Sequence, residues 1–207
     1  MPMKARREKE KKDMKNAILD AASKIIAEEG YDKLSMRKIA DVIDYTPTTI
    51  YSYYKDKAEI VDGISRRIHD KIMHDVKVAL DDSKSSSIDI QLKFMFMAFL
   101  YSIANSPEMG NAVIKSGTGI IFGPSDDGIS QERNGVMMLR NFLARGQQEG
   151  VFRELDDNMS WMLITALVGF SLNSIENQLY LDESWPHLVE IYADMLVRGL
   201  LLGRAEL

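Results

Sequence analysis

The chain has 207 residues, of which 45% are hydrophobic, and it contains no cysteine. This length is enough for one medium or two small domains with a buried core, and the composition argues against a disordered chain. Disulfides, thiolate zinc sites and cysteine nucleophiles are excluded. Residues 1–57 hold 13 Lys and Arg against 10 Asp and Glu, a balance of +3, whereas residues 58–207 hold 13 against 21, a balance of −8. A basic front end indicates an anionic partner there.

Neither a secretory signal nor a membrane span is predicted. The first fifteen residues, MPMKARREKEKKDMK, are highly charged and lack the apolar core of a signal peptide. The longest apolar runs, such as WMLITALVGF from Trp161 to Phe170, fall short of the ~20 residues that cross a bilayer. We therefore expect a cytoplasmic protein.

The first predicted helix is built on one apolar stripe that ends before Gly30. Its members recur at helical spacings of three and four residues: Ile18, Ala21, Ala22, Ile25 and Ile26. Gly30 favours the end of a helix, because glycine readily adopts the left-handed conformation found just past a helix C-terminus.

Two short helices follow, each with a recognisable start. Ser35 can cap a helix over residues 36–42, whose inward positions are Met36, Ile39, Ala40 and Ile43. Thr46 can cap a third helix with Pro47 in its first position, where the missing N–H group costs nothing. We expect this third helix to run to about Tyr54. Asp44 and Tyr45 form a tight connection between the two.

The rest of the chain is also helical in pattern. Helices are predicted over residues 57–80, 88–105, 107–116, 129–149, 157–181 and 185–203. Small polar residues break the pattern over 81–87, and SGTGIIFGPSDDG, from Ser116 to Gly128, has the composition of a loop. No segment alternates with a period of two, so the sequence predicts an all-α fold of about nine helices.

Two short helices joined by a tight turn, the second begun by Thr-Pro, fit a helix-turn-helix. A recognition helix must enter a major groove about 12 Å wide, so its outward residues must be small or polar. Thr48, Thr49 and Ser52 meet that requirement. Ile50 and Tyr54 can anchor the opposite side in a core.

The segment from Ala17 to Val61, AILDAASKIIAEEGYDKLSMRKIADVIDYTPTTIYSYYKDKAEIV, closely resembles the TetR family of one-component transcriptional regulators. The matching positions are Glu29-Gly30-Tyr31, Ser35, Ile39-Ala40, Ile50-Tyr51-Ser52-Tyr53-Tyr54 and Lys57. The turn departs from the family's usual Gly-Val, because Asp44-Tyr45 stands there. Asp tolerates the left-handed conformation that such a turn requires.

The resemblance implies a DNA-binding domain over residues 1–57 and a helical effector-binding and dimerisation domain over 58–207. It places Pro47, Thr48, Thr49, Tyr51 and Ser52 near bases and the adjacent backbone. Arg37 would contact a base or a phosphate. Phosphate contacts are implied for Ser35, Tyr53 and Lys57, and Thr46 completes the DNA-binding set, with helix capping as its main role.

Several of these positions have simpler interpretations. Tyr51 can equally be a core residue, and Thr46 and Pro47 can serve only to start a helix. The segment KARREKEKK, from Lys4 to Lys12, can lie along the duplex or enter a minor groove. It can also be a solvated extension of the first helix, held by ion pairs four residues apart.

The C-terminal helices 157–181 and 185–203 resemble the family's dimerising pair in position. The stripe of Leu188, Ile191, Tyr192, Met195, Leu196 and Leu200 is wide for one helix, which suits burial on two sides. An ordinary intramolecular core is the alternative. The family also implies a ligand pocket, and the candidate wall residues are Met97, Tyr101, Phe142, Trp161, Thr165, Asn173 and Asn177.

The sequence therefore predicts a ligand-responsive regulator, most simply a repressor. It would bind a palindromic operator as a dimer and be released by a small hydrophobic effector. A helical module of the same fold that binds a protein partner is the alternative. An enzyme is not expected, because His69 and His74 are five residues apart and do not share a helix face, and no P-loop or GxSxG motif occurs. No cofactor or metal is predicted.

Overall fold

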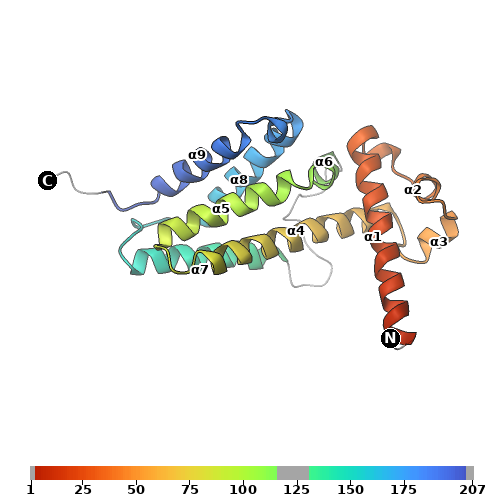
Figure 1. Ribbon diagram of the computed structural model, residues 1–207, viewed down its shortest axis with the longest axis horizontal. Helices are drawn as coiled ribbons and strands as arrows, with labels where there is room; N and C mark the ends of the chain where they lie inside the picture. Colours follow the sequence, from red (N-terminus) through yellow and green to blue (C-terminus); the bar gives the residue numbers. More distant parts are fainter. Residues whose placement is uncertain (1–2, 116–130, 204–207) are drawn as a thin grey trace. The chain divides into compact units, whose positions relative to one another are not determined.

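The computed structural model describes residues 3–115 and 131–203. Within these ranges the chain forms nine α-helices and two short 3₁₀ turns (Figure 1). The only extended pairing there is an isolated bridge between Phe152 and Leu201. The all-α class predicted from the sequence is confirmed. The predicted loop from Ser116 to Gly128 lies outside the described residues.

The helices follow the predicted order closely. They are α1 (Met3–Glu29), α2 (Met36–Val42), α3 (Pro47–Tyr51), α4 (Lys57–Asp82), α5 (Ile88–Ala104), α6 (Pro107–Lys115), α7 (Gln131–Gln148), α8 (Met159–Glu176) and α9 (Trp185–Arg198). The 3₁₀ turns are η1 (Tyr31–Lys33) and η2 (Leu179–Leu181). The segment from Lys4 to Lys12 is helical and part of α1, and its contact with a duplex remains a prediction.

α3 ends earlier than predicted, at Tyr51 rather than Tyr54. The Ser52 amide is shared between the Thr48 (3.2 Å) and Thr49 (3.1 Å) carbonyls, and the Tyr53 amide bonds to the Ile50 carbonyl three residues back (3.0 Å). Bonds of this span tighten the chain into a 3₁₀-type turn and close the α-helix. The recognition helix is therefore little more than one turn long.

The predicted helix 157–181 is also wrong at its C-terminal end, because α8 stops at Glu176. Gln178 adopts a positive φ of 55°, a left-handed conformation that cannot continue a right-handed helix. By length and composition α8 could cross a membrane, but 44% of it is buried in the fold. A buried core helix passes the same test, so this is weak evidence for a membrane span.

The described residues fall into two compact units. The first contains residues 3–68 and 106–115, so it extends beyond the expected 1–57 to include the start of α4 and all of α6. Within it, α1 packs against α6, η1 and α2, and α2 packs against α3. Its core is made of fully buried isoleucines: Ile18, Ile26, Ile39, Ile50, Ile60 and Ile64. Burial of these branched side chains fixes the short helices that cannot be stable alone.

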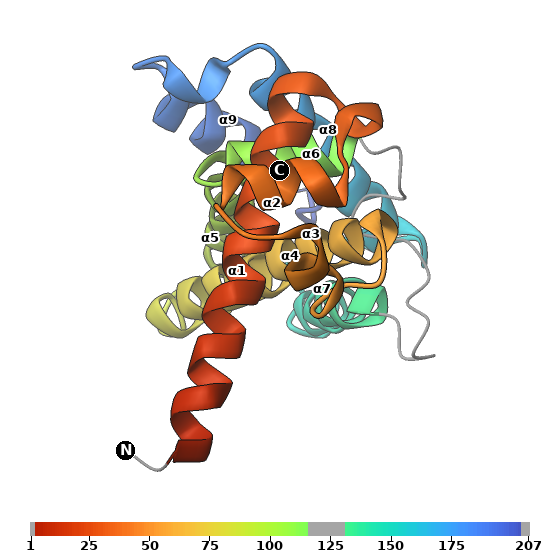
Figure 2. The ribbon, with the colours of Figure 1, turned by 90° about the vertical axis from the view of Figure 1, so that its right-hand side faces the viewer.

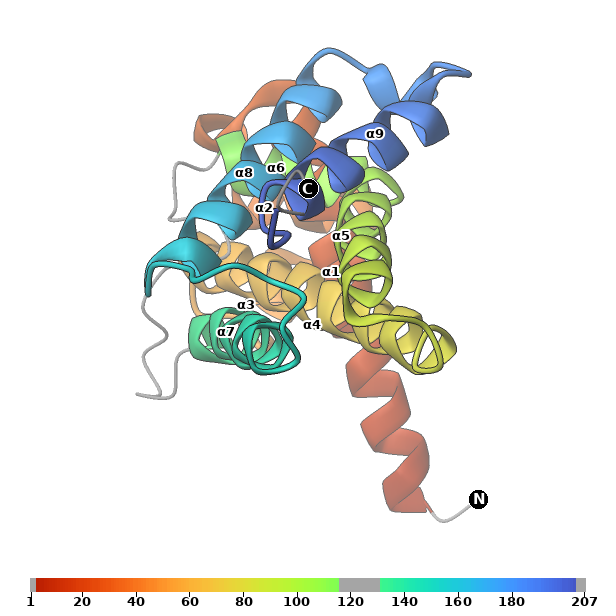
Figure 3. The same ribbon diagram turned by 90° about the vertical axis from the view of Figure 1, so that its left-hand side faces the viewer.

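The second unit contains residues 69–105 and 131–203, and α4 continues into it. Here α5 packs against α8 and α9, and α7 packs against α8 (Figure 3). The Phe170 ring of α8 stacks on Tyr192 of α9 with centroids 4.1 Å apart, and also on Trp185 at 5.8 Å. A side chain at Gly146 would meet the Phe152 ring, since a Cβ there would lie 2.0 Å from it. Only glycine allows this close approach.

Candidate nucleic-acid interface

The turn between α2 and α3 has the predicted left-handed residue. Asp44 adopts a φ of 59°, and the amide of Tyr45 bonds to the Ala40 carbonyl at 2.9 Å. On the other side of α2, Ser35 caps the helix by accepting a hydrogen bond from the Lys38 amide at 3.2 Å. The two helices are thus fixed by hydrogen bonds between residues close in sequence.

The hydroxyl groups at the start of α3 are mostly engaged with the helix itself. Thr46 Oγ1 accepts a hydrogen bond from the Thr49 amide (3.2 Å) and lies 3.0 Å from Thr49 Oγ1. Ser52 Oγ donates to the Thr49 carbonyl at 2.6 Å. Capping is therefore the structural role of Thr46, as predicted. Thr48 is exposed and forms no such bond with any residue that the structure describes.

The ten predicted DNA-binding residues lie at accessible positions of the first unit. Seven are exposed, namely Ser35, Arg37, Thr46, Pro47, Thr48, Tyr51 and Ser52. Thr49, Tyr53 and Lys57 are partly buried. Tyr51 is 57% exposed, so its interpretation as a core residue is wrong. Ile50 and Tyr54 are buried and anchor this segment, as expected.

Two tyrosines hold lysine side chains beside this surface. The Lys57 ammonium lies over the Tyr31 ring, 4.2 Å from its centroid, and the Lys15 ammonium lies 5.2 Å from the centre of the Tyr54 ring. Burial raises the pKa of Tyr54, helped by the nearby Glu59 carboxylate. A cation over an aromatic face is favourable by about 0.5–1 kcal/mol at an exposed site. Tyr31 was predicted only as part of the family pattern, not as a partner of Lys57.

The N-terminus of α4 has its own carboxylate partners. Asp56 Oδ1 accepts a hydrogen bond from the Glu59 amide (2.9 Å), and Glu59 Oε2 accepts one from the Lys55 amide (2.6 Å). These carboxylates occupy the amides of Lys55 and Glu59 and place negative charge at this helix end. The Lys55 and Lys57 side chains are the cations nearest in sequence that could attract a phosphate to this end of α4.

Tyr45 is a further accessible residue that the predicted set leaves out. Its side chain is 50% exposed, although it occupies a position just before the N-cap that usually holds an apolar side chain packed on the helix. The only signal in the sequence was the departure from the family's Gly-Val at this turn.

The predicted ligand-binding residues differ in burial. Phe142 is buried, with the Arg145 guanidinium 4.8 Å from its ring centre, and Met97 and Tyr101 are partly buried. The other four candidates are all exposed: Trp161, Thr165 and Asn173 of α8 and Asn177 at its C-cap. Four of the seven predicted wall residues are thus in contact with solvent in the isolated chain, and the pocket that they would share with Phe142 remains a prediction.

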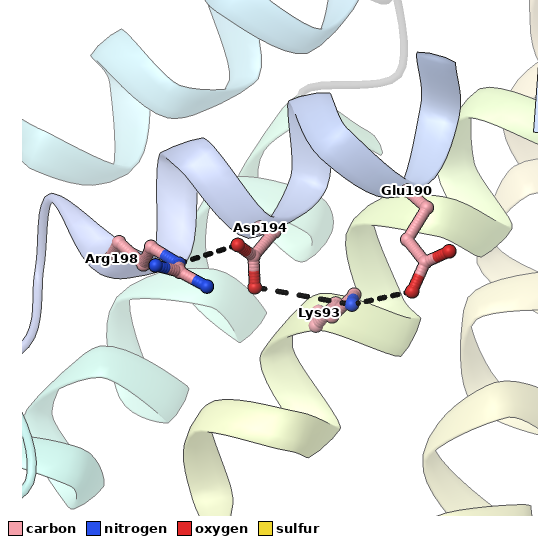
Figure 4. Close-up of polar contacts among 4 residues, drawn as sticks. All are labelled: Lys93, Glu190, Asp194 and Arg198. Atoms are coloured by element: carbon pink, nitrogen blue, oxygen red, sulfur yellow. Dashed lines mark hydrogen bonds and ion pairs between the residues drawn. The ribbon is translucent and has the colours of Figure 1, made fainter. Parts of the chain in front are cut away.

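The outer sides of α8 and α9 expose large apolar side chains. Trp161 and Met162 of α8 and Ile191 and Met195 of α9 are each about half exposed. Charged side chains of α5 and α9 form a row of ion pairs (Figure 4), and two of them, Glu190 and Asp194, directly precede Ile191 and Met195 in the sequence. Lys93 Nζ of α5 lies 3.0 Å from Glu190 Oε1 and 3.9 Å from Asp194 Oδ1, and Arg198 also pairs with Asp194.

Sequence comparison finds a known family that is similar to part of the first unit. The family model of bacterial regulatory proteins, tetR family, matches residues 18–64. An uncharacterized HTH-type transcriptional regulator of Haemophilus influenzae is 31% identical over 74 residues. That alignment covers 36% of this chain and 40% of the relative, so the chain spans less than half of the relative's length.

Comparison with solved structures extends the likeness to the whole fold. The fatty acid degradation regulator FadR of Bacillus halodurans has a TM-score of 0.72 at 20% identity, over 90% of this chain and 95% of that one. The ketosteroid transcriptional regulator KstR2 of Mycobacterium tuberculosis has a TM-score of 0.68 at 18% identity, over 92% and 96%. Such low identities show a shared fold and nothing more about ligand or target.

Proposed function

This chain belongs to the TetR family of bacterial transcriptional regulators, and we propose that it is a ligand-responsive repressor that binds a palindromic operator as a dimer. The main support is the construction of α3. Ile50 is fully buried and fixes the helix, while Thr48 and Tyr51 on the other side are exposed. A short helix held in this way can present its outer side chains to base edges without losing its anchor.

We assign the predicted DNA contacts by the exposure of each side chain and by whether it already forms a hydrogen bond within the protein. Arg37, Thr48 and Tyr51 are exposed and form no side-chain hydrogen bond within the described residues, so we propose that they contact bases or the adjacent backbone. Pro47, Thr49 and Ser52 would shape this surface, since the hydroxyls of the last two bond to α3 itself. Phosphate contacts fall to Ser35, Tyr53 and Lys57, with Thr46 as the cap.

Selection of bound fragments from random duplexes tests the proposal directly. We expect a palindromic consensus, because two recognition helices related by a two-fold axis read half-sites about 34 Å apart. With about six phosphate contacts per dimer, the logarithm of the binding constant should fall with the logarithm of salt concentration at a slope near −5. A protein that prefers no duplex over random competitor at low salt would overturn the proposal and favour the protein-binding alternative.

Two kinds of variant separate base contacts from phosphate contacts. Arg37→Ala or Thr48→Ala should relax the selected consensus at particular positions, with a loss of about 1–3 kcal/mol for a base-reading arginine. Lys57→Met should weaken binding to all duplexes alike and reduce the salt slope by about 1. If Arg37→Ala and Thr48→Ala leave the consensus unchanged, α2 and α3 do not read the operator as proposed.

We propose that the dimer forms through the outer faces of α8 and α9. The support is the exposed apolar set Trp161, Met162, Ile191 and Met195, which one chain alone leaves in contact with water. Apolar surface removed from water contributes about 25 cal/mol per Å². The salt-bridged row Lys93, Glu190, Asp194 and Arg198 lies beside Ile191 and Met195 and would form a polar rim, as is common at interfaces.

A hydrophobic effector is proposed for the second unit. Met97 and Phe142 give this unit an adaptable, apolar set, and Tyr101 adds a hydroxyl whose pKa is raised by partial burial. Two proteins that share the fold have named roles: FadR is a fatty acid degradation regulator, and KstR2 is a ketosteroid transcriptional regulator. Fatty acyl compounds and steroids are therefore the first classes to screen.

The effector would act by linkage. A ligand that binds better to a conformation unsuited to the operator must weaken DNA binding by its difference in affinity. α4 runs without a break from the first unit into the second, so we propose that it transmits the change. A saturating effector should shift operator affinity by about 1–3 kcal/mol. If no compound from either class changes operator binding, the proposed effector is wrong while the DNA-binding proposal stands. A bacterial transcriptional regulator acts on chromosomal DNA, so we propose that the protein acts in the cytoplasm.

A further inference from the structure

The N-terminal turns of α1 extend beyond the packed part of the first unit. Burial in α1 begins at Ile18, whereas residues 3–13 are exposed. Figure 2 shows the N-terminal turns of α1 projecting from the other helices of this unit. At 1.5 Å per residue, Lys4 lies about 17 Å along the helix from Lys15. The anchor of this extension is firm, because Leu19 packs against Gly63 and Asp20 bonds to Arg67 at 2.6 Å.

The charges of the extension are sorted onto different faces. Lys4, Arg7, Lys11 and Lys15 follow one another at intervals of three or four residues, so they form one row along the helix. Arg6 lies on a different face, where it pairs with Glu10 at 2.8 Å. Within the described part of the chain, Lys4, Arg7 and Lys11 form no ion pair. Glu8 is the acidic residue nearest to this row, because it lies four residues after Lys4 and three before Lys11 on the helix.

The cationic row is continuous with the buried face of α1. The same spacing leads from Lys15 to Ile18 and Ala22, both fully buried. Lys15 itself lies over the ring of Tyr54, which follows α3 by three residues. The extension therefore leaves the first unit beside the C-terminal end of the recognition helix, with its cations on the side that faces that end.

We propose that the row of Lys4, Arg7 and Lys11 binds duplex phosphates flanking those reached by α2 and α3. The inference rests on the proposed DNA-binding function and adds a contact outside the helix-turn-helix. The three cations span about 10 Å of helix, and a duplex presents one negative charge per about 1.7 Å of its axis. Several phosphates thus lie within reach. Such contacts are independent of base sequence and lengthen the bound duplex.

Two matched triple variants test the inference. Lys4→Gln, Arg7→Gln and Lys11→Gln remove the row, while Arg6→Gln, Lys9→Gln and Lys12→Gln remove the same number and kind of charges from other faces of the same segment. Each is titrated with two duplexes selected by the wild-type protein, one trimmed to the consensus and one carrying about 10 base pairs on each side. Circular dichroism checks that both variants keep the helix.

The wild-type protein should bind the flanked duplex more tightly than the trimmed one. The row variant should lose this gain, and its salt slope on the flanked duplex should flatten by up to about 2.7 per subunit, since each phosphate contact contributes about 0.9. The control variant should keep most of the gain, and Glu8→Gln should increase it. Equal behaviour of the two triple variants, or no gain from the flanks, would overturn the inference while leaving the helix-turn-helix proposal intact. A protein that binds no duplex would overturn both.

Discussion

The recognition helix α3 and the C-terminal helix α9 both present a free face, but the two faces differ in chemistry. α3 has five residues, and its free side consists mainly of hydroxyl groups, a proline ring and Tyr51. α9 has fourteen residues, and it exposes Ile191 and Met195, which are 51% and 56% accessible. α3 is held in shape by bonds between neighbours in sequence, whereas α9 is held by ring stacking and ion pairs with α8 and α5.

The difference indicates two partners bound by different forces. A polar face remains well hydrated until it meets phosphates and base edges, and binding there depends strongly on salt. An apolar face gains free energy simply by leaving water, which depends little on salt. DNA binding and dimerisation should therefore respond separately to mutations on α3 and α9.

The largest expected effect comes from placing charges on the apolar face. Ile191→Glu combined with Met195→Glu should weaken the dimer by about 100-fold or more, near 3 kcal/mol, because two carboxylates would have to be buried unpaired. Sedimentation equilibrium measures the change. Val78→Glu is the control, since Val78 is 45% exposed on α4 and lies outside this face. A double variant that remains as dimeric as the control would place the interface elsewhere.

Loss of the α3 cap should have a smaller and purely local effect. Thr46→Ala removes the acceptor of the Thr49 amide and should cost about 1 kcal/mol in stability of the recognition helix. Operator affinity should fall about fivefold, while the dimer is unchanged. Thr48→Ala deletes the same atoms from an exposed position without a capping bond, and it should leave stability unaffected. Equal unfolding midpoints in urea for the two variants would contradict the capping role.

The contact between Lys57 and Tyr31 offers a finer test of the DNA-binding face. If the ring positions the ammonium for a phosphate, Tyr31→Leu and Lys57→Met should not be additive in operator affinity. The expected coupling is about 0.5–1 kcal/mol, the strength of an exposed cation–π contact. Operator titrations of the two single variants and the double variant measure it. Strict additivity would show that Tyr31 only packs and does not position Lys57.

Acid should act first on the second unit, which contains a buried histidine. Burial lowers the pKa of His69, against the opposing effect of Asp70. The unfolded chain then takes up a proton before the folded one, so stability is full above the ordinary value near 6.5 and declines as the pH falls below it. Partial burial would raise the pKa of Asp75, but hydrogen bonds from Lys71 and Ser102 lower it overall, so its loss of stability comes at still lower pH.

Both tryptophans, Trp161 and Trp185, belong to the second unit, so their fluorescence reports its unfolding alone. Urea midpoints measured in this way should fall between pH 7.5 and pH 5. His69→Gln should flatten that dependence without changing its sign at lower pH, where Asp75 titrates. If His69→Gln keeps the wild-type pH dependence of the urea midpoint, His69 is not the cause of that dependence.

Several features could be predicted because they depend on neighbours in sequence. The bounds of α2, the caps at Ser35 and Thr46 and the left-handed Asp44 agree with the structure. Each is decided by a side-chain hydrogen bond to an amide three residues away or by a local backbone preference. Both depend only on residues within a short segment of the sequence. The end of α3 at Tyr51 was missed, because a 3₁₀-type turn and another α-helical turn differ little in local preference.

The sequence by itself determined the helical class, the helix-turn-helix and the surface on which its polar residues lie, since short-range bonds and the period of apolar residues are enough to fix them. Only the tertiary structure decided which side of α8 and α9 stays exposed, that Lys57 lies over Tyr31, and that the cations of α1 continue its buried face past α3. Periodicity identifies an apolar or charged stripe, but the neighbour that covers the stripe comes from distant parts of the chain, or from another molecule.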